Sequence, residues 1–328
     1  MFPNFSYLKA KSVEDAAHQT TGADVHVMSG GTDLLGCLRD GVFPASRLVS
    51  LKDLDELRRI RQLRSGRNGD GLGIGALVTI SRVATDRDVS RRFPVLAQAA
   101  QAVASPQLRN QGTLGGNLCQ KPRCWYYRGE FPCVRRGGAF CSAMDGQNQF
   151  HCILGGDACV YVHPSDTAPA LTALDATVAV AGPRGDRTVP VGEFFVPPAD
   201  DPTRETVLEA GEIVTEILVP GLPSGARSSY RKVRSRGAWD FAVVSTALVL
   251  DLDGGQVRDA RVVLGGVAPV PWRSEAAEAE LNGRALTTET ARRAAEAAVA
   301  DAQPLEHNAA KVDIARGVLE TELLKLKG

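Results

Sequence analysis

The stretch Val25-His26-Val27-Met28-Ser29-Gly30-Gly31-Thr32-Asp33-Leu34 decides the fold class, because a short strand passes through two glycines into a helix. Consecutive glycines let the backbone approach an anion, and a helix N-terminus offers unpaired N–H groups. A second stretch of this kind is Thr113-Leu114-Gly115-Gly116-Asn117. Neither has the spacing of a dinucleotide fingerprint or a P-loop. One such turn alone is more often structural, but two suggest a diphosphate held from both sides.

Short units of strand and helix surround these turns. Ser12 begins a helix as its N-cap, and Asp15 is placed to complete a capping box. Residues 71–76 form a Gly-rich strand, and the apolar stretch 94–103 predicts a buried helix. The first two thirds of the chain is therefore expected to contain compact units of mixed strand and helix.

The C-terminal part differs in composition and pattern and begins after a Pro- and Gly-rich linker at 220–225. The apolar run 241–250 predicts a buried strand, and Asp253-Gly254-Gly255 turns it back into a second strand at 257–264. Ala-rich helices are expected at about 274–282, 287–302 and 309–326. An α+β domain of about one hundred residues follows from this pattern.

Composition excludes several classes of function. The 328 residues carry 38 basic and 38 acidic side chains, so no surplus of positive charge is available for nucleic acid. No apolar run reaches the roughly 20 residues of a membrane span. The segment from Met1 to Tyr7 lacks the pattern of a secretory signal, so we expect a cytoplasmic protein.

Seven cysteines require an explanation that suits a reducing compartment. Six of the seven lie between Cys119 and Cys159, in a stretch with no sustained helical or strand periodicity. A structureless stretch of this length inside a compact domain needs an internal tether. In a cytosolic protein such clustering favours metal or redox chemistry over a disulfide framework.

The motifs together resemble the FAD-binding subunits of the molybdenum hydroxylases, the family of xanthine dehydrogenase and aldehyde oxidoreductase. The resemblance runs in order over nearly the whole chain, through Ser29–Leu35, Leu72–Ala76, Gln111–Asn117, His163–Leu171, Tyr230–Arg234 and Leu264–Ala268. It implies an α+β fold in which residues 1–222 form a FAD-binding domain of two subdomains, like that of vanillyl-alcohol oxidase. Residues 223–328 would then form a C-terminal domain like that of the CO dehydrogenase flavoprotein.

The same resemblance implies a set of FAD contacts. These residues are His26, Val27, Met28, Ser29, Gly30, Gly31, Thr32, Asp33, Leu34, Thr113, Leu114, Gly115, Gly116, Asn117, Asp166, Val214 and Lys232. Asp166 would bond the cofactor, and Lys232 would bring a cation toward it from the C-terminal domain. Read without the family, Asp166 is a helix N-cap and Lys232 a solvated surface lysine. No side chain is assigned as a catalytic acid or base.

The cysteine insertion resembles the smaller set of these subunits that carry a [4Fe–4S] cluster. The resemblance places the ligands at Cys124, Cys133, Cys141 and Cys159, within a loop at 119–159. Zinc is the competing metal, although among these cysteines only Cys119 and Cys124 approach its usual paired spacing. Cys119 is then buried or near the cluster, while Cys37 and Cys152 read as core residues, the latter in a strand-like run.

The expected function is electron transfer within a complex. The resemblance implies a large molybdopterin subunit and a small [2Fe–2S] subunit that pass electrons through this FAD to a small-molecule acceptor: NAD, a quinone, ferredoxin or O₂. A partner with a Tat signal would carry the complex to the periplasm. The intercysteine spacing favours the aldehyde or xanthine type over 4-hydroxybenzoyl-CoA reductase. A stand-alone flavin oxidoreductase and a zinc-binding scaffold are the rival classes.

Overall fold

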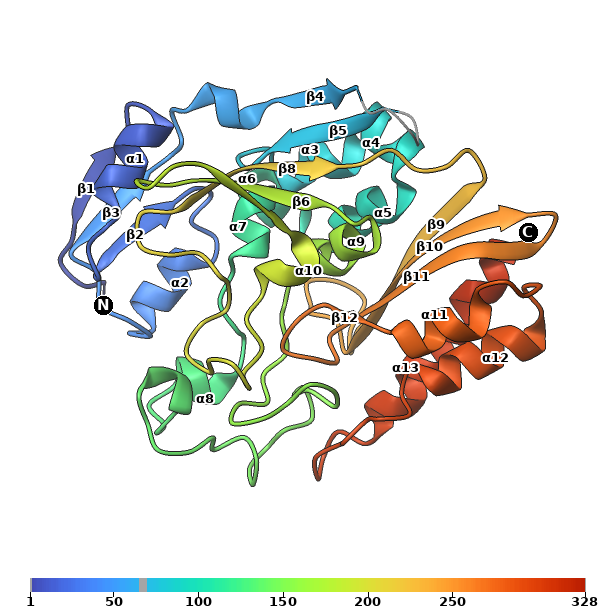
Figure 1. Cartoon of the computed structure of the whole chain (residues 1–328). Helices are drawn as coiled ribbons and strands as arrows, with labels where there is room; N and C mark the ends of the chain where they lie inside the picture. Colours follow the sequence, from blue (N-terminus) through green and yellow to red (C-terminus); the bar gives the residue numbers. More distant parts are fainter. Residues whose placement is uncertain (1, 65–69, 328) are drawn as a thin grey trace.

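The computed structural model describes residues 2–64 and 70–327, so Met1 of the N-terminal segment lies outside it, and arranges them around three β-sheets (Figure 1). The first sheet is parallel, in the order β1 (Ser6–Lys9), β3 (Arg47–Ser50), β2 (Val25–Met28). Its crossovers contain α1 (Val13–Gln19) and α2 (Leu34–Arg39), which confirms the strand and helix expected around the first glycine pair. Ser12 caps α1 as predicted, but the Asp15 carboxylate bonds Lys11 N rather than closing the box on Ser12.

The second sheet is antiparallel and has five strands. Its order is β4 (Ile60–Leu63), β5 (Gly71–Gly75), β8 (Ile213–Val219), β6 (Thr177–Ala181), β7 (Arg187–Pro190). The main hydrophobic core joins this sheet to α3 (Ile80–Thr85), α4 (Arg87–Arg92), α5 (Pro94–Ala102), α7 (Leu114–Leu118) and α9 (Thr167–Ala173). Smaller elements are η1 (Asp55–Arg58), α6 (Pro106–Gln111) and α10 (Val191–Phe194). Because β8 follows the 119–159 loop in the sequence and pairs with β5 before it, segments on both sides of the loop belong to one sheet.

The third sheet belongs to the C-terminal part and carries its helices on one face (Figure 1). Its order is β12 (Trp272–Arg273), β11 (Gln256–Gly265), β10 (Val244–Asp253), β9 (Ala226–Val233), with helices α11 (Glu275–Leu281), α12 (Thr288–Ala297) and α13 (Ala310–Lys327). The expected hairpin is confirmed, and Gly254 and Gly255 take positive φ angles of 56° and 87°. The strand expected at 241–250 begins only at Val244, because Phe241 belongs to a loop.

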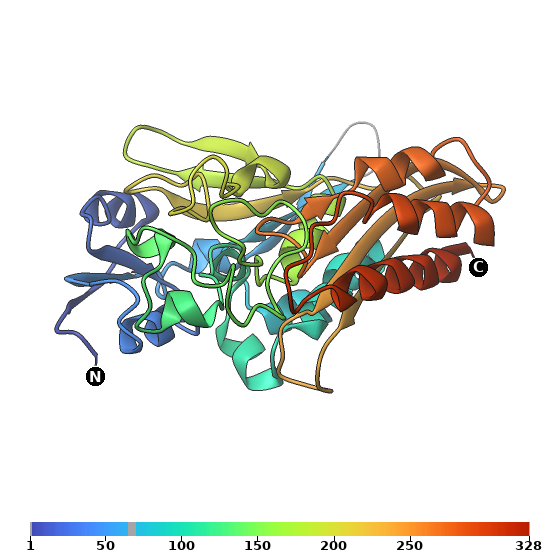
Figure 2. The same ribbon diagram turned by 90° about the horizontal axis from the view of Figure 1, so that it is seen from below.

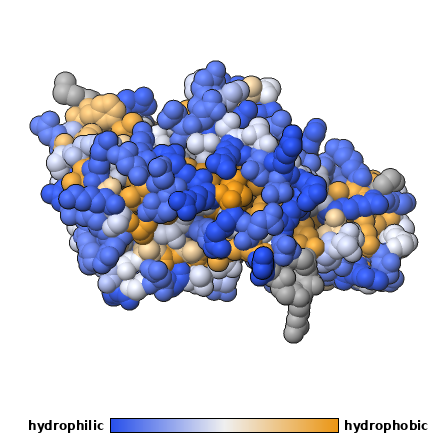
Figure 3. Space-filling model, turned by 90° about the horizontal axis from the view of Figure 1, so that it is seen from above, coloured by the Kyte–Doolittle hydropathy of each residue, from blue (hydrophilic) through white to orange (hydrophobic). Residues whose placement is uncertain are grey.

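The 119–159 loop carries two short helical turns, α8 (Trp125–Arg128) and η2 (Val134–Arg136). Seen from below, it lies between the N-terminal sheet and the C-terminal helices (Figure 2). The upper face of the molecule is mainly hydrophilic, with small hydrophobic areas between polar side chains (Figure 3). In the described part of the chain, no helix combines the length and apolarity needed to cross a bilayer.

Candidate flavin and cysteine sites

A cavity of about 450 Å³ lies between the unit of β2 and α2, the segment of α6 and α7, and the end of β9. It is lined by most of the predicted cofactor residues, namely His26, Val27, Ser29, Gly30, Gly31, Thr32, Asp33, Leu34, Thr113, Gly116, Asn117, Asp166 and Lys232. This volume is in the range of small-molecule sites, and its walls come from separate segments between His26 and Phe241. We call it the flavin pocket.

Four predicted contacts do not line this pocket. Met28 and Leu114 point into hydrophobic clusters, as expected for side chains that alternate with pocket-facing neighbours. A Cβ on Gly115 would lie 2.9 Å from the Ala76 Cβ, so this glycine serves close packing. Val214 lies on β8 and is buried in the main core.

The first glycine turn leaves backbone donors free. Among the described residues, none accepts a hydrogen bond from the main-chain N–H groups of 30–33. Gly31 takes a φ of +75°, a conformation that L side chains rarely adopt. Gly30 packs so closely on Gln111 that a Cβ would overlap its carbonyl oxygen. Unpaired donors of this kind at the start of a helix have the chemistry that favours an anion.

The second glycine turn differs, because the predicted turn is the helix α7. Its first donors are all used: Leu114 N bonds Val78 O at 2.9 Å, Gly115 N bonds Ala76 O at 2.9 Å, and Gly116 N bonds the Thr113 hydroxyl at 3.2 Å. Thr113 is also 3.0 Å from the Ser29 hydroxyl, which joins the two turns. The second turn therefore supports the first instead of offering a second set of donors.

Asp166 and Lys232 meet inside the protein. The Lys232 ammonium lies 2.7 Å from one Asp166 oxygen, the Tyr230 hydroxyl donates to the other at 2.7 Å, and both charged side chains are almost fully buried. Burial raises the pKa of Asp166, although Lys232 opposes this shift. Lys232 is thus not a solvated surface lysine. Asp166 occupies the N-cap position of α9 without capping it, because Ser165 accepts from Ala168 N at 3.0 Å.

Asn117 connects this segment to α7. Its side-chain oxygen accepts from the hydroxyls of Ser165 at 2.6 Å and Thr167 at 2.7 Å. The amide oxygen is therefore occupied by protein donors at the edge of the flavin pocket. This contact fixes α9 against α7 and so positions Asp166.

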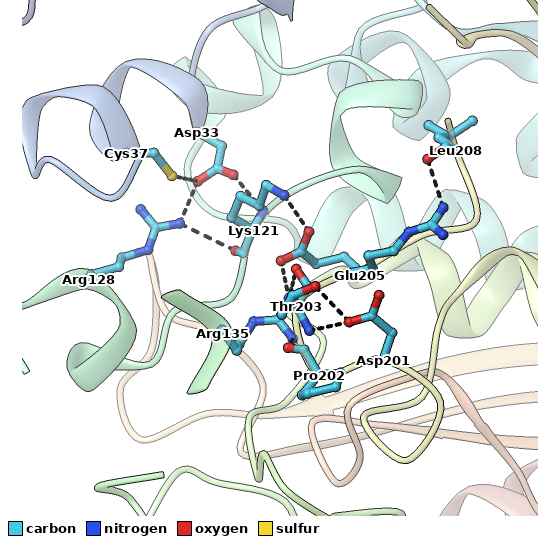
Figure 4. A network of polar contacts seen from close by, with 11 residues as sticks. Asp33, Cys37, Lys121, Arg128, Arg135, Asp201, Pro202, Thr203, Glu205 and Leu208 are labelled. Carbon is cyan, nitrogen blue, oxygen red and sulfur yellow. Dashed lines mark hydrogen bonds and ion pairs between the residues drawn. The ribbon is translucent and has the colours of Figure 1, made fainter. Parts of the chain in front are cut away.

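The Asp33 carboxylate binds residues of the cysteine loop (Figure 4). Its carboxylate accepts from Lys121 N at 2.7 Å and from the Arg128 guanidinium at 2.8 Å, and it pairs with Arg123. Burial alone would raise the pKa of Asp33, but the two guanidinium groups outweigh it and lower the pKa below 3.8. The sequence interpretation missed both arginines, although their density within 121–128 was a visible signal.

A second ion cluster surrounds the buried Glu205, just before β8. Its carboxylate pairs with Lys121 and Arg135, two residues of the cysteine loop (Figure 4). Arg135 also donates to Pro202 O at 2.5 Å and stacks over the Tyr161 ring at 4.5 Å. The loop therefore has protein tethers of its own, whereas the sequence suggested only the cysteines.

The four predicted cluster ligands lie near one another. Cys133 and Cys141 form a backbone bridge, and the hydrogen bond between the Cys159 and Cys141 thiols lowers the pKa of Cys141 and raises that of Cys159. Burial raises the pKa of Cys124 to about 11, with added effects of Cys133 and Cys141. In residues 2–64 and 70–327, no three His, Cys, Asp or Glu side chains are grouped to hold one metal ion.

The remaining cysteines occupy other surroundings. Cys37 is buried on α2 and lies 3.9 Å from Asp33, as expected for a core thiol. Cys152 is buried too, but it lies in irregular backbone bonded to Val160 instead of the expected strand. Cys119 follows α7 and lines the flavin pocket. Other pocket residues not anticipated from sequence include Lys121, Arg123, Arg236, Trp239 and Phe241.

Similar proteins share this architecture over its whole length. Residues 3–222 match the family described as FAD binding domain in molybdopterin dehydrogenase, and residues 228–313 match the CO dehydrogenase flavoprotein C-terminal domain. The chain is 36% identical to the aldehyde oxidoreductase FAD-binding subunit PaoB of Escherichia coli (strain K12), covering 98% of each chain. It is 30% identical to the carbon monoxide dehydrogenase medium chain of Hydrogenophaga pseudoflava, covering 93% of this chain and 89% of that one.

A solved structure agrees with these sequence matches. The carbon monoxide dehydrogenase from Hydrogenophaga pseudoflava aligns with a TM-score of 0.77 at 30% identity, over 100% of this chain and 98% of that one. The expected α+β fold with its two family domains is confirmed. From these matches and the pocket at the glycine turns, the chain belongs to the family of FAD-binding subunits of the molybdenum hydroxylases, which are oxidoreductases.

Proposed function

We propose that this chain is the FAD- and [4Fe–4S]-containing electron-transfer subunit of a heteromeric molybdenum hydroxylase, of the aldehyde oxidoreductase type. The observation that carries the proposal is its full-length similarity to an aldehyde oxidoreductase FAD-binding subunit, at 36% identity. The geometry adds a pocket with free backbone donors and four neighbouring thiols beside it.

The residues present fit FAD. The free N–H groups of 30–33 would hold the pyrophosphate, since nothing else in the described chain satisfies them. The Asp166–Lys232 pair would meet the cofactor from the opposite wall, with the carboxylate fixed by Tyr230. Bound flavin supplies the exchange between single-electron and two-electron donors and acceptors. The chain's own part is to position the cofactor and balance its charge.

The cysteine loop fits a [4Fe–4S] cluster better than zinc. Structural zinc sites usually pair their ligands at short spacing, whereas Cys124, Cys133, Cys141 and Cys159 lie at least eight residues apart, as a long loop wrapped around a cluster would place them. Cys124, Cys133, Cys141 and Cys159 would hold the cluster, which would supply one-electron transfer.

The partners in this proposal are a large molybdopterin subunit and a small [2Fe–2S] subunit, with a small-molecule acceptor at the flavin. Relatives support it because they are named as a FAD-binding subunit and a medium chain. The isolated chain should therefore not oxidise aldehydes or purines at an enzymatic rate. A chain that did so alone would be a stand-alone flavin enzyme instead.

Single Cys→Ser variants of the purified chain test the cluster. We expect Cys124→Ser, Cys133→Ser, Cys141→Ser and Cys159→Ser to lose or cripple it, because serine is a harder and poorer ligand for iron. Iron and sulfide analysis with low-temperature EPR after dithionite reduction measures this. Cys37→Ser and Cys152→Ser are matched controls, since both thiols are buried and neither is a proposed ligand.

The outcome separates three alternatives. Unchanged iron in all four variants removes the cluster from the proposal. Loss of the cluster in Cys152→Ser but not in Cys159→Ser reassigns the fourth ligand. If the wild-type chain contains zinc in place of iron and sulfide, the loop holds a structural metal ion and the cluster is removed from the proposal.

A further inference from the structure

A second cavity of about 140 Å³ lies beside the flavin pocket. The two cavities share the lining residues Arg123, Pro164, Asp166, Asp240 and Phe241. Of the four proposed cluster ligands, Cys124 alone is among the lining residues described for this second cavity. Cys124 therefore marks the side of the cysteine cluster that faces the flavin pocket.

His151 lines the same cavity and contacts Cys124. Its Nε2 lies 3.2 Å from the Cys124 sulfur, and the side chain is buried. A metal-bound thiolate has no proton to give, so in that state Nε2 must carry the proton and donate. Backbone contacts hold the residue in place, because its carbonyl oxygen accepts from Lys311 Nζ at 2.8 Å and Asn308 Nδ2 at 3.2 Å.

The surrounding rings fix the imidazole. Trp125 and Tyr126 place their ring centroids 5.8 Å and 6.2 Å from that of His151. Both follow Cys124 directly on α8, so the ligand and the aromatic wall around its partner belong to one segment. Of the ring nitrogens, Nδ1 has no partner among the described residues, which leaves Nε2 as the nitrogen that makes a contact.

We propose that His151 is a positioning residue for the cluster, and that its hydrogen bond stabilises negative charge on the Cys124 thiolate. Hydrogen bonds to cluster sulfurs raise the reduction potential, because the reduced cluster carries the extra electron. The inference rests on the cluster of the proposed function.

The test compares two histidines that line the same cavity. His151→Phe removes the donor, His151→Gln returns an N–H donor at similar reach, and His163→Gln changes a buried histidine that contacts no cysteine ligand. The measurement is an EPR-monitored redox titration of the cluster and a titration of the flavin in each FAD-loaded chain. We expect a more negative cluster potential in His151→Phe, recovery in His151→Gln, and wild-type values in His163→Gln.

Iron and sulfide analysis of the same samples distinguishes a missing cluster from a cluster whose potential does not depend on His151. A wild-type chain without iron and sulfide contradicts the proposed function itself. A cluster that is present, but whose potential is unchanged in His151→Phe, overturns the role of His151 and leaves the function intact. If His151→Phe cannot hold the cluster, His151→Leu replaces it as the variant without a donor, and an unchanged cluster potential in that variant overturns the proposal.

Discussion

The two glycine turns look alike in sequence and do different work in the structure. The first, Ser29–Asp33, keeps its backbone donors free and has Gly31 in a left-handed conformation. The second, Thr113–Asn117, is a helix whose first donors are already bonded to Ala76, Val78 and the Thr113 hydroxyl. A glycine pair therefore marks a place where another group can come close to the backbone. Whether that group is a ligand or the protein itself depends on whether the backbone N–H groups of the turn already have protein acceptors.

The largest effect is expected at the first turn. Gly31→Val should weaken FAD binding by about a hundredfold or more, since a β-branched residue is strained at this φ and would turn the free donors away. Flavin fluorescence titration of the apo-chain measures the affinity. Gly41→Val is the matched control, because Gly41 has a φ of +65° with open space around it and lies outside the pocket. Equal losses in both variants would show that strain, not donor placement, governs binding.

A smaller effect is expected from the ion pair behind the first turn. Asp33→Asn leaves Arg123 and Arg128 without their carboxylate, and we expect a loss of roughly 3 kcal/mol in the free energy of unfolding. Because the pKa of Asp33 is lower in the folded chain than in the unfolded one, the pair contributes its full stability above the unfolded pKa and loses it as pH falls through the lower folded pKa.

Urea unfolding of wild type and Asp33→Asn at pH 7 and at pH 3 measures this difference. The gap between the two proteins should narrow at the lower pH. Arg61→Met is a useful control, since the Arg61–Glu216 pair is exposed on its arginine side and distant in sequence from the loop. A gap that stays constant with pH would show that Asp33 acts through packing instead of charge.

The smallest effect is expected at the second turn. Thr113→Val removes the cap of α7 and the contact with Ser29, which should cost about 1 kcal/mol of stability. FAD affinity should fall less than tenfold, because no free donor is lost. Thermal unfolding and the same fluorescence titration measure both quantities. A fall in FAD affinity as large as that of Gly31→Val would show that the second turn contributes to FAD binding as much as the first.

Sequence reasoning located the elements better than the partners of their side chains. The strand and helix around Ser29–Leu34 and the hairpin at Gly254-Gly255 followed from local patterns, because glycine positions and periodicity are local properties. The pairing of Asp33 with Arg123 and Arg128 could not be read this way, since it joins segments about ninety residues apart in the chain. The helical state of 114–118 was missed because two glycines favour a turn until long-range bonds decide otherwise.

The walls of the flavin pocket come from segments as far apart in the sequence as His26 and Phe241, so they are synthesised at different times. The free donors of 30–33 emerge early from the ribosome, but Lys232 and Phe241 follow only after β8 has closed its sheet. The contacts that hold the cysteine loop at His151 form later still, because Asn308 and Lys311, which bond its carbonyl oxygen, are made near the end of synthesis. Domains fold in the order in which they are made. A nascent chain therefore presents the first glycine turn long before the residues that complete the pocket wall have been made.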